Sequence, residues 1–267
     1  MDYRNLASST APQAGFRVGF RVLRSDRWQT LPIGSEQKTL LITGASSGIG
    51  AETARRAVDE GWCVVLGARR EDRLEQLASD LGGEEKAIAR RCDVTDWDDQ
   101  QALVAAGIDA FGRIDAVFAN AGFGAKRGFL EESVEHWREM VLTNVYGAAL
   151  TIRASLPTLL EQDSGHFLIT GSVAGRVALP GSLYSSTKWA VSGMGESLRS
   201  ELRQMHQNSS IRVTLIEPGM VDTEFFDNRP SNALSDTDIA NACLYALSQP
   251  EGVDVNEILV RPSHQPI

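Results

Sequence analysis

Short apolar runs alternate with longer helix-forming segments along most of the chain, and this alternation limits the possible folds more than any other feature of the sequence. Within the runs, apolar residues are continuous, which is typical of parallel strands that are buried on both faces. The segments between them have the composition and capping residues of helices. Such an order predicts one parallel sheet with helices on both faces and right-handed crossovers.

The expected elements follow one another from residue 38 onward without a break in composition. Strands are expected at residues 39–43, 63–68, 86–94, 114–120, 166–172, 211–219 and 256–262. Helices are expected at residues 51–62, 70–83, 95–112, 133–160, 184–206 and 236–250. We therefore predict a single α/β domain over residues 38–267, built as a Rossmann-type doubly wound sheet of about seven parallel strands.

Residues 1–37 differ from the rest of the chain. They contain five arginines and the near-repeat GFRVGFRV, and they contain no clear apolar core segment. A secretory signal would need a longer apolar stretch, and Asp2 and Asp26 weaken a resemblance to an organelle transit peptide. We expect a poorly ordered N-terminal extension, or a start codon assigned too far upstream.

Composition and charge exclude several classes of function. The formal net charge is −9, and the chain lacks the basic stripe of a nucleic-acid-binding protein. No apolar run approaches the roughly 18 residues of a membrane span. The three cysteines and four histidines follow no metal or redox spacing. We expect no metal site, cysteines that serve as small packing residues, and a cytoplasmic location.

The stretch TGASSGIG, residues 43–50, follows the first expected strand and precedes the first expected helix. In this context Gly44 allows a tight turn, Gly48 lets the backbone approach a pyrophosphate, and Gly50 allows close packing of helix and strand. The helix N-terminus then presents free N–H groups to the phosphates. The alternative is a glycine-rich loop that only connects strand and helix. The order of strand, glycines and helix favours a dinucleotide site.

Two arginines lie at the tip of the second expected strand, where NAD-binding chains carry a carboxylate that accepts hydrogen bonds from the ribose 2′-hydroxyl. They are Arg69 and Arg70, which follow Ala68 directly. Arginine can bind phosphate through two parallel hydrogen bonds, so we expect Arg69 to bind the 2′-phosphate of NADP. Arg70 is either a second phosphate ligand or a solvated residue at the start of a helix.

Seven motifs in one order give the chain a resemblance to the short-chain dehydrogenase/reductase family in its compact single-domain form. In chain order they are TGASSGIG, CDV, ANAG, TNVYG, TGSVAG, YSSTK and EPGMVDT. The resemblance covers roughly residue 38 to the C-terminus. One minor departure is that Ala119 precedes Asn120, where the family usually has two asparagines.

The resemblance implies a catalytic tetrad of Asn144, Ser172, Tyr184 and Lys188. Tyr184 would exchange a proton with the substrate hydroxyl. A free tyrosine has a pKa of about 10, so the charge of Lys188, one helical turn further on, would be needed to favour the phenolate. Lys188 would also bind the nicotinamide ribose. Ser172 would orient the substrate oxygen, and Asn144 would hold a water that relays the proton to solvent.

The resemblance also implies an NADP(H) site. Asp93 and Val94 would line the adenine pocket, residues 120–122 would run beside the adenine ribose, and residues 218–223 would hold the nicotinamide carboxamide. The complete set of expected cofactor-binding residues is Gly44, Ser46, Ser47, Gly48, Ile49, Gly50, Arg69, Arg70, Asp93, Val94, Asn120, Ala121, Gly122, Tyr184, Lys188, Pro218, Gly219, Val221 and Thr223.

These features predict an NADP(H)-dependent oxidoreductase that transfers a hydride between nicotinamide and a small alcohol or carbonyl substrate. The stretches TEFFDNRP and VDVNEILVRPSHQP resemble the branch of 3-hydroxy acid dehydrogenases and clavulanate dehydrogenase-like aldehyde reductases. In that branch Arg229 would bind a substrate carboxylate; a solvent-exposed loop arginine is the alternative.

Two other classes of function stay open. One is a non-catalytic NADP-binding or redox-sensing protein on the same fold. The other is a nucleotide-sugar epimerase, which shares the Tyr-x-x-x-Lys motif but usually has a different glycine spacing and a larger C-terminal domain. The family resemblance implies a homodimer or homotetramer. We expect neither a nucleic-acid nor a membrane partner.

Overall fold

The computed structural model describes residues 37–207, 209–225 and 231–265. Over these residues, parallel strands form one sheet in the order β3-β2-β1-β4-β5-β6-β7. The strands are β1 (Thr39–Thr43), β2 (Cys63–Ala68), β3 (Ala87–Arg91), β4 (Ala116–Ala119), β5 (Ser164–Thr170), β6 (Ser210–Pro218) and β7 (Glu257–Val260). The predicted Rossmann-type fold class is confirmed. The predicted extension, residues 1–37, lies outside the described residues except for Gln37.

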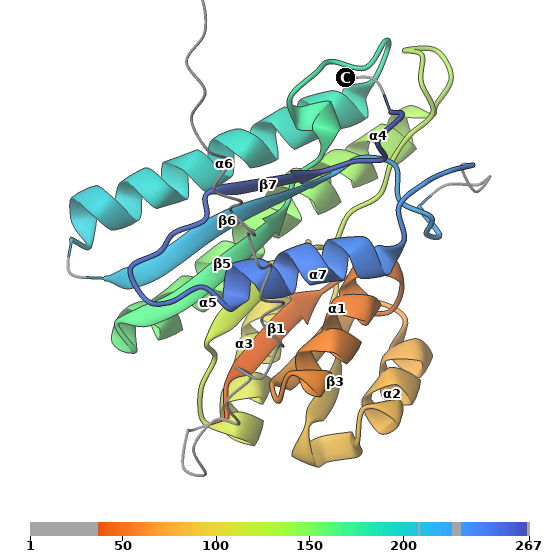
Figure 1. The fold of residues 1–267 in the computed structure, drawn as a ribbon. Helices are drawn as coiled ribbons and strands as arrows, with labels where there is room; N and C mark the ends of the chain where they lie inside the picture. Colours follow the sequence, from red (N-terminus) through yellow and green to blue (C-terminus); the bar gives the residue numbers. More distant parts are fainter. Residues whose placement is uncertain (1–36, 208, 226–230, 266–267) are drawn as a thin grey trace, which may run out of the picture. The chain divides into compact units, whose positions relative to one another are not determined.

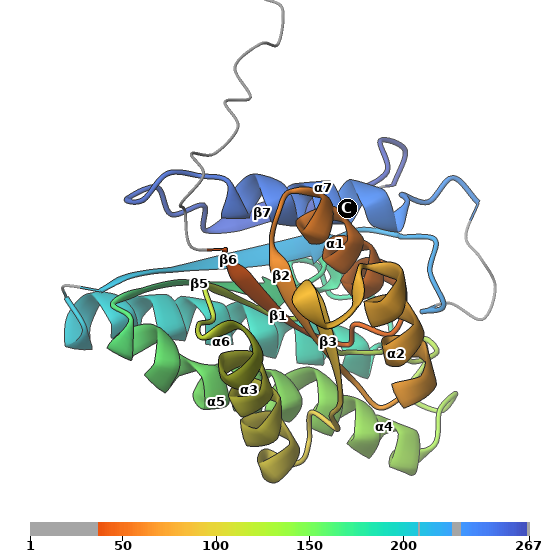
Figure 2. The same cartoon turned by 90° about the horizontal axis from the view of Figure 1, so that it is seen from below.

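Helices cover both faces of the sheet, as Figures 1 and 2 show from two directions. One face carries α1 (Gly48–Asp59), α2 (Glu71–Asp80) and α7 (Asp236–Leu247). The other face carries α3 (Trp97–Phe111), α5 (Ala148–Glu161) and α6 (Leu183–Met205), with α4 (Val134–Val141) beside α6. Three short segments complete the set: η1 (Gly83–Glu85), η2 (Leu142–Gly147) and η3 (Val173–Gly175).

Two apolar cores, one on each face, explain why the central strands are buried on both sides. Successive side chains of a strand point to opposite faces. Leu40 and Ile42 of β1 therefore join the core with α1 and α7, whereas Leu41 joins the core with α3, α5 and α6. Every residue of β1 and β2 is buried.

The chain order of the strands reverses beside β1. β2 and β3 lie on one side of it, and β4 to β7 lie on the other. In open parallel sheets, ligands bind outside the carboxyl ends of the strands at such a reversal. β1 ends at Thr43 and β4 at Ala119, so this edge carries both the glycine-rich turn and the ANAG motif.

The helix expected at residues 133–160 consists of three consecutive segments. α4 leads into the π-helical segment η2, and α5 follows from Ala148. A π-helical turn is locally wider than an α-helix and occurs frequently at functional sites. Helix-forming composition does not distinguish the two, so η2 was not expected. The third strand also ends earlier than expected, and Asp93 and Val94 lie in the loop after it.

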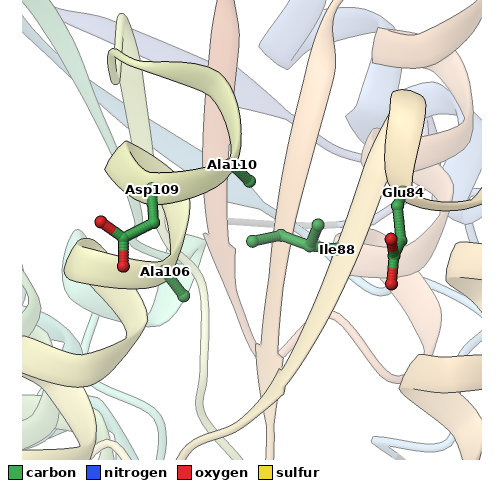
Figure 3. Close-up of a pocket in the computed structure, with 5 residues that line it drawn as sticks. All are labelled: Glu84, Ile88, Ala106, Asp109 and Ala110. Atoms are coloured by element: carbon green, nitrogen blue, oxygen red, sulfur yellow. The ribbon is translucent and has the colours of Figure 1, made fainter.

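A shallow depression lies at the opposite edge of the sheet, between the start of β3 and the end of α3 (Figure 3). It is lined by Glu84, Ile88, Ala106, Asp109 and Ala110. None of the residues expected to form a functional site lines it. The expected site residues lie instead at the carboxyl edge.

His166 is a polar residue in the middle of the sheet. It is 1% exposed, its Nε2 lies 2.8 Å from Thr214 Oγ1, and its Nδ1 has no hydrogen-bond partner among the described residues. Burial and, to a smaller extent, the charge of Arg212 lower the pKa of His166 to about 3. The folded protein therefore holds this side chain in its neutral form.

We predict that His166 makes the protein less stable as the pH falls below about 6.5. The unfolded chain binds a proton near that pH, whereas the folded chain does so only near pH 3. Between about pH 7.5 and about pH 5, the free energy of unfolding should fall by about 2 kcal/mol more in the wild type than in His166→Gln. Urea unfolding at both pH values measures this difference. An equal loss in the two proteins would contradict the prediction.

Candidate active site

The glycine-rich turn packs backbone against backbone. Gly44 and Gly48 have φ values of +69° and +53°, in the left-handed region that favours glycine. A Cβ at Gly44 would lie 2.8 Å from Ala121 Cα, and one at Gly50 would lie 2.5 Å from the Gly44 oxygen. The turn therefore lies directly against the ANAG segment, and α1 begins within it at Gly48. Ile49, the second residue of α1, is partly buried and packs at the margin of the core.

Asn120 joins the carboxyl ends of three strands. Its Nδ2 donates hydrogen bonds to the oxygens of Thr43, at 3.2 Å, and Gly44, at 3.3 Å. Its Oδ1 accepts a hydrogen bond from Thr170 Oγ1 at 3.1 Å. These contacts fix the turn after β1 relative to β4 and β5.

Arg70, rather than Arg69, lies against the glycine-rich turn. Arg70 Nε donates to Ser46 Oγ at 3.1 Å, and its Nη2 donates to Ser47 Oγ at 2.5 Å. Arg69 is exposed. Burial alone would raise the pKa of Asp93, but hydrogen bonds from Thr95 and the charges of Arg69 and Arg91 outweigh burial and lower it. Arg69 therefore acts electrostatically on the expected adenine pocket.

Val94 is buried and fixes the distance between the CDV loop and η2. A Cβ at Gly147 would lie 2.6 Å from Val94 Cγ2, and the Val94 oxygen accepts a hydrogen bond from Gln100 Nε2 at 3.0 Å. The same Gln100 nitrogen also donates to Thr151 Oγ1 at 2.8 Å. The expected adenine-side residue Val94 is thus held by packing and by a buried amide.

Asn144 lies in η2 and connects the loop after β4 to α6. Its Oδ1 accepts a hydrogen bond from the Phe123 nitrogen at 3.0 Å. Its Nδ2 donates to the Phe123 oxygen at 2.9 Å and to Thr187 Oγ1 at 3.2 Å. Asn144 is 2% exposed, so the amide holds these elements in a fixed arrangement. Thr187 was not expected to take part, because its spacing in YSSTK gives no sign of this contact.

Tyr184 is placed by the cap of α6. Ser182 precedes the helix and accepts a hydrogen bond from the Ser185 nitrogen, so Tyr184 lies in the first turn. Its hydroxyl hydrogen-bonds with Ser172. Lys188 Nζ lies 5.7 Å from the centre of the Tyr184 ring and donates to the Thr170 oxygen at 2.8 Å. The structure therefore brings Ser172, Tyr184 and Lys188 together. Gly122 lies between this cluster and Asn144, because a Cβ at Gly122 would lie 3.0 Å from Asn144 Oδ1 and 3.8 Å from Lys188 Nζ.

Burial shifts the two titratable groups of this cluster away from their charged forms. It raises the pKa of Tyr184 to about 12, although the hydrogen bond with Ser172 acts in the opposite direction. It lowers the pKa of Lys188 to about 8. Paired titratable groups whose pKa values are shifted by burial are a feature of catalytic sites.

An ion pair between a buried carboxylate and a partly exposed arginine supports the segment that carries Ser172. Ser172 begins η3 and accepts a hydrogen bond from the Ala174 nitrogen at 3.1 Å. At the other end of η3, Arg176 Nε donates to both oxygens of Glu217, at 2.8 and 3.0 Å. Glu217 is 1% exposed and belongs to β6. The ion pair thus holds η3 against the strand that leads to Pro218.

The segment after β6 folds back over the glycine-rich turn. A Cβ at Gly48 would lie 3.2 Å from Thr223. Phe225 packs edge-on against Tyr184, with the ring centres 5.5 Å apart. We call residues 223–225 the strap, because they run from the turn to Tyr184. The strap and its contacts could not be expected from sequence, since Phe225 and Tyr184 are far apart along the chain.

Residues 218–221 are fixed by the C-terminal segment. Gln265 Oε1 accepts a hydrogen bond from the Met220 nitrogen at 2.9 Å, and Gly219 leaves room for the Arg261 side chain, since a Cβ would lie 2.7 Å from Arg261 Cβ. Val221 is buried and pairs with Leu234 in an isolated bridge. No sequence signal pointed to Gln265.

Other predictions from the sequence concern features outside this site. Arg229, expected at a substrate carboxylate, lies outside the described residues. Among the residues that the structure describes, no cluster of histidine, cysteine and carboxylate side chains is arranged to hold a metal. No described helix has both the length and the apolar character to cross a membrane.

The doubly wound sheet, with a glycine-rich turn at its strand reversal, defines a nucleotide-binding α/β protein. The family model described as short chain dehydrogenase matches residues 38–233. The chain therefore belongs to the short-chain dehydrogenase/reductase family of oxidoreductases.

Individual relatives agree with this assignment. An uncharacterized oxidoreductase of Staphylococcus saprophyticus is 40% identical over 86% of this chain and 98% of its own length. An alcohol dehydrogenase of Thermococcus sibiricus complexed with 5-hydroxy-NADP has a TM-score of 0.78 and 31% identity, over 87% of this chain and 99% of that one. Serine dehydrogenase of Escherichia coli has a TM-score of 0.77 and 30% identity, over 86% and 100%. Other similar structures are complexed with NADP+ or with NAD.

We predict that Gly44→Ala destabilises the protein more than Gly112→Ala. Both glycines have similar positive φ values, +69° and +75°, but no atom lies within 4 Å of a Cβ at Gly112. Gly112→Ala should therefore cost only the backbone strain, about 1–2 kcal/mol. Gly44→Ala adds a clash with the Ala121 backbone, about 1–3 kcal/mol more. Chemical denaturation of both variants measures the difference, and equal losses would count against the close approach of the two segments.

Proposed function

We propose that the protein is an NADP(H)-dependent oxidoreductase that transfers a hydride between nicotinamide and a small alcohol or carbonyl compound. The observation that carries the proposal is the cluster of Ser172, Tyr184 and Lys188 at the carboxyl edge of the sheet. Membership of an oxidoreductase family supports the reaction class. We assign the catalytic function to one domain, residues 38–267.

The residues at the strand reversal fit a dinucleotide. The first N–H groups of α1 have no side-chain cap, and free N–H groups at a helix N-terminus bind phosphate. Gly122 keeps space open above Lys188, since a Cβ there would lie 3.8 Å from Nζ. We therefore assign cofactor binding to the residues expected from the sequence, with Asp93 and Val94 at the adenine and residues 218–223 at the nicotinamide.

We assign the proton transfer to Tyr184, and a bound nicotinamide would supply or accept the hydride. In reduction, the Tyr184 hydroxyl gives its proton to the carbonyl oxygen while the carbon gains the hydride. In oxidation, the phenolate takes the hydroxyl proton. The raised pKa keeps the Tyr184 hydroxyl protonated, as a proton donor requires. The phenolate that acts as the base in oxidation needs a positive charge nearby. Lys188 carries such a charge below its pKa of about 8.

Ser172 and Asn144 are assigned to positioning and proton relay. Ser172 already hydrogen-bonds with Tyr184, so a substrate oxygen placed between the two hydroxyls would be oriented by both. The side-chain amide of Asn144 is bonded to Phe123 and Thr187. We therefore assign the relay water to the backbone of η2 beside Asn144 rather than to its amide.

Arg70 is proposed as the main ligand of the 2′-phosphate, with Arg69 as a second positive charge beside it. The contacts of Arg70 with Ser46 and Ser47 support this choice, because they hold its guanidinium beside the phosphate-binding turn. Similar proteins complexed with NADP+ support an NADP(H) cofactor, although one was solved with NAD. Binding constants of the two cofactors therefore decide this point.

The proposed substrate is a small alcohol, aldehyde or 3-hydroxy acid. The likeness to serine dehydrogenase supports the hydroxy-acid class, and Arg229 is the proposed carboxylate ligand. Absorbance of NADPH during incubation with a panel of such compounds tests this proposal. We further propose a cytoplasmic homodimer or homotetramer, with no nucleic-acid or membrane partner.

We predict that Tyr184→Phe lowers kcat by about 10²- to 10⁴-fold while the dissociation constant of NADPH changes little. Phenylalanine keeps the ring that packs against Phe225 but has no proton to transfer. Steady-state turnover assays measure kcat, and a fluorescence titration with NADPH measures the dissociation constant. Turnover equal to that of the wild type would instead favour a non-catalytic NADP-binding or redox-sensing protein.

We predict that Arg70→Ala weakens NADPH binding about 10- to 100-fold, because charge-assisted hydrogen bonds to the 2′-phosphate are lost. NADH has no such phosphate, so its dissociation constant should change less than about twofold by the same reasoning. Arg69→Ala is the matched control and should have the smaller effect on NADPH. A larger effect of Arg69→Ala would return the main role to Arg69.

A further inference from the structure

The strap, residues 223–225, is held by a different element at each of its positions. Thr223 packs against Gly48 of the glycine-rich turn. Glu224 pairs with arginines on and beside α2. Phe225 packs against Tyr184 of α6. The middle contact is ionic, and it involves the same side chain that is proposed to bind the 2′-phosphate.

Glu224 accepts hydrogen bonds from two guanidinium groups. Arg70 Nη1 lies 2.7 Å from Glu224 Oε2, and Arg73 Nη1 lies 2.8 and 2.9 Å from the two carboxylate oxygens. Hydrogen bonds from Arg70 and then from Arg73 lower the pKa of Glu224 to about 2. The carboxylate is therefore charged at neutral pH.

The remaining nitrogens of Arg70 point to the glycine-rich turn. Its Nε and Nη2 donate to Ser46 and Ser47. One guanidinium thus bridges the turn and the strap, with Nη1 on the carboxylate side. A phosphate on a ribose beside this turn would meet a guanidinium whose outer edge is already used by an anion.

Glu224 and a phosphate would compete for these donors. The side chains of Arg70, Arg73 and Glu224 are 41%, 45% and 54% exposed, and exposed ion pairs stabilise a protein only slightly. A phosphate monoester has a higher charge and three acceptor oxygens, so it forms the stronger pair. Two anions close together also repel each other, so the carboxylate weakens the binding of the phosphate it competes with.

We propose that Glu224 is a specificity-determining residue that competes with the 2′-phosphate of NADP(H) for Arg70 and Arg73. It lowers the affinity for NADP(H) and leaves the affinity for NAD(H) unchanged. The ratio of the two affinities is therefore smaller than it would be without Glu224. This inference rests on the proposed dinucleotide site. It concerns the strap, whose first residue, Thr223, is assigned by the family motifs to the nicotinamide end of the cofactor rather than to the adenosine end.

Glu224→Gln tests the proposal, because it removes the charge and keeps the shape of the side chain. NADPH and NADH are titrated by nicotinamide fluorescence, and 2′,5′-ADP and ADP by calorimetry. We expect Glu224→Gln to bind NADPH and 2′,5′-ADP about fivefold more tightly than the wild type, which corresponds to about 1 kcal/mol. The affinities for NADH and ADP should stay within about twofold, since neither carries the phosphate.

Glu71→Gln is the matched control. Glu71 is exposed in the first turn of α2, immediately after Arg70, and among the described residues it forms no ion pair with Arg70 or Arg73. Its substitution changes the net charge by the same amount. We expect no selective gain for NADPH. An equal gain in Glu71→Gln would show a general effect of charge and overturn the proposal.

Other outcomes separate this inference from the proposed function. If the wild type binds NADPH and Glu224→Gln leaves the ratio of NADPH to NADH affinity unchanged, the competition by Glu224 is overturned and the proposed function stands. If the wild type binds neither dinucleotide, the proposed function fails. Glu224→Ala serves as a second variant, and it should reproduce the selective gain because the charge is removed in both. Thermal unfolding of each variant confirms that it is folded.

Discussion

The reversal of strand order beside β1 is the constraint on which the rest of the structure depends. β1 and β4 pair as far as Ile42 and Phe118, and the backbone groups that follow need other hydrogen-bond partners. Asn120 supplies such partners, because its amide donates to the oxygens of Thr43 and Gly44 while its carbonyl accepts from Thr170. This side chain thus links the chain after β1 to the ends of β4 and β5. The glycine-rich turn can approach the ANAG segment because Gly44 has no Cβ, which would lie 2.8 Å from Ala121 Cα.

The same edge also determines the electrostatics of the candidate site. The sheet below it is apolar on both faces, so the surroundings of Lys188 solvate its charge poorly. Its ammonium is held mainly by the Thr170 oxygen, at the end of one of the strands that Asn120 joins. Burial therefore lowers the pKa of Lys188 and raises that of Tyr184 for a common reason. The position that brings the two groups together also makes their charged forms costly.

The fold could be predicted from the sequence because its signal is local. Runs such as TLLIT and CVVLGA are buried on both faces and contain no charged residue, which is typical of a covered parallel sheet. The π-helical segment η2 has no such signal, since it has the same composition as the α-helices beside it. Motif order identified Ser172, Tyr184 and Lys188, and the structure brings them together. Their roles in catalysis stay predictions.

Contacts between distant segments were the part that sequence could not supply. Arg70 and Glu224 are 154 positions apart, and each has a plausible local role as a helix-start or loop residue. Their pairing depends on the path of the chain after β6, which no short motif determines. The strand-tip position favoured Arg69 as the phosphate ligand, but the direction of a side chain at a strand end depends on its contacts beyond the strand. Ser46, Ser47 and Glu224 are those contacts for Arg70.

The strap contacts both ends of the candidate site. Glu224 contacts the side chains proposed for the adenosine end, and the next residue, Phe225, contacts Tyr184 at the end proposed to react. Adjacent residues of one chain have Cα atoms only about 3.8 Å apart, so the strap brings the two sets of contacts close together. Burial raises the pKa of Tyr184, and the packing of Phe225 against the ring contributes to that burial. One short segment therefore contacts both the arginines beside the glycine-rich turn and the tyrosine whose acidity burial lowers.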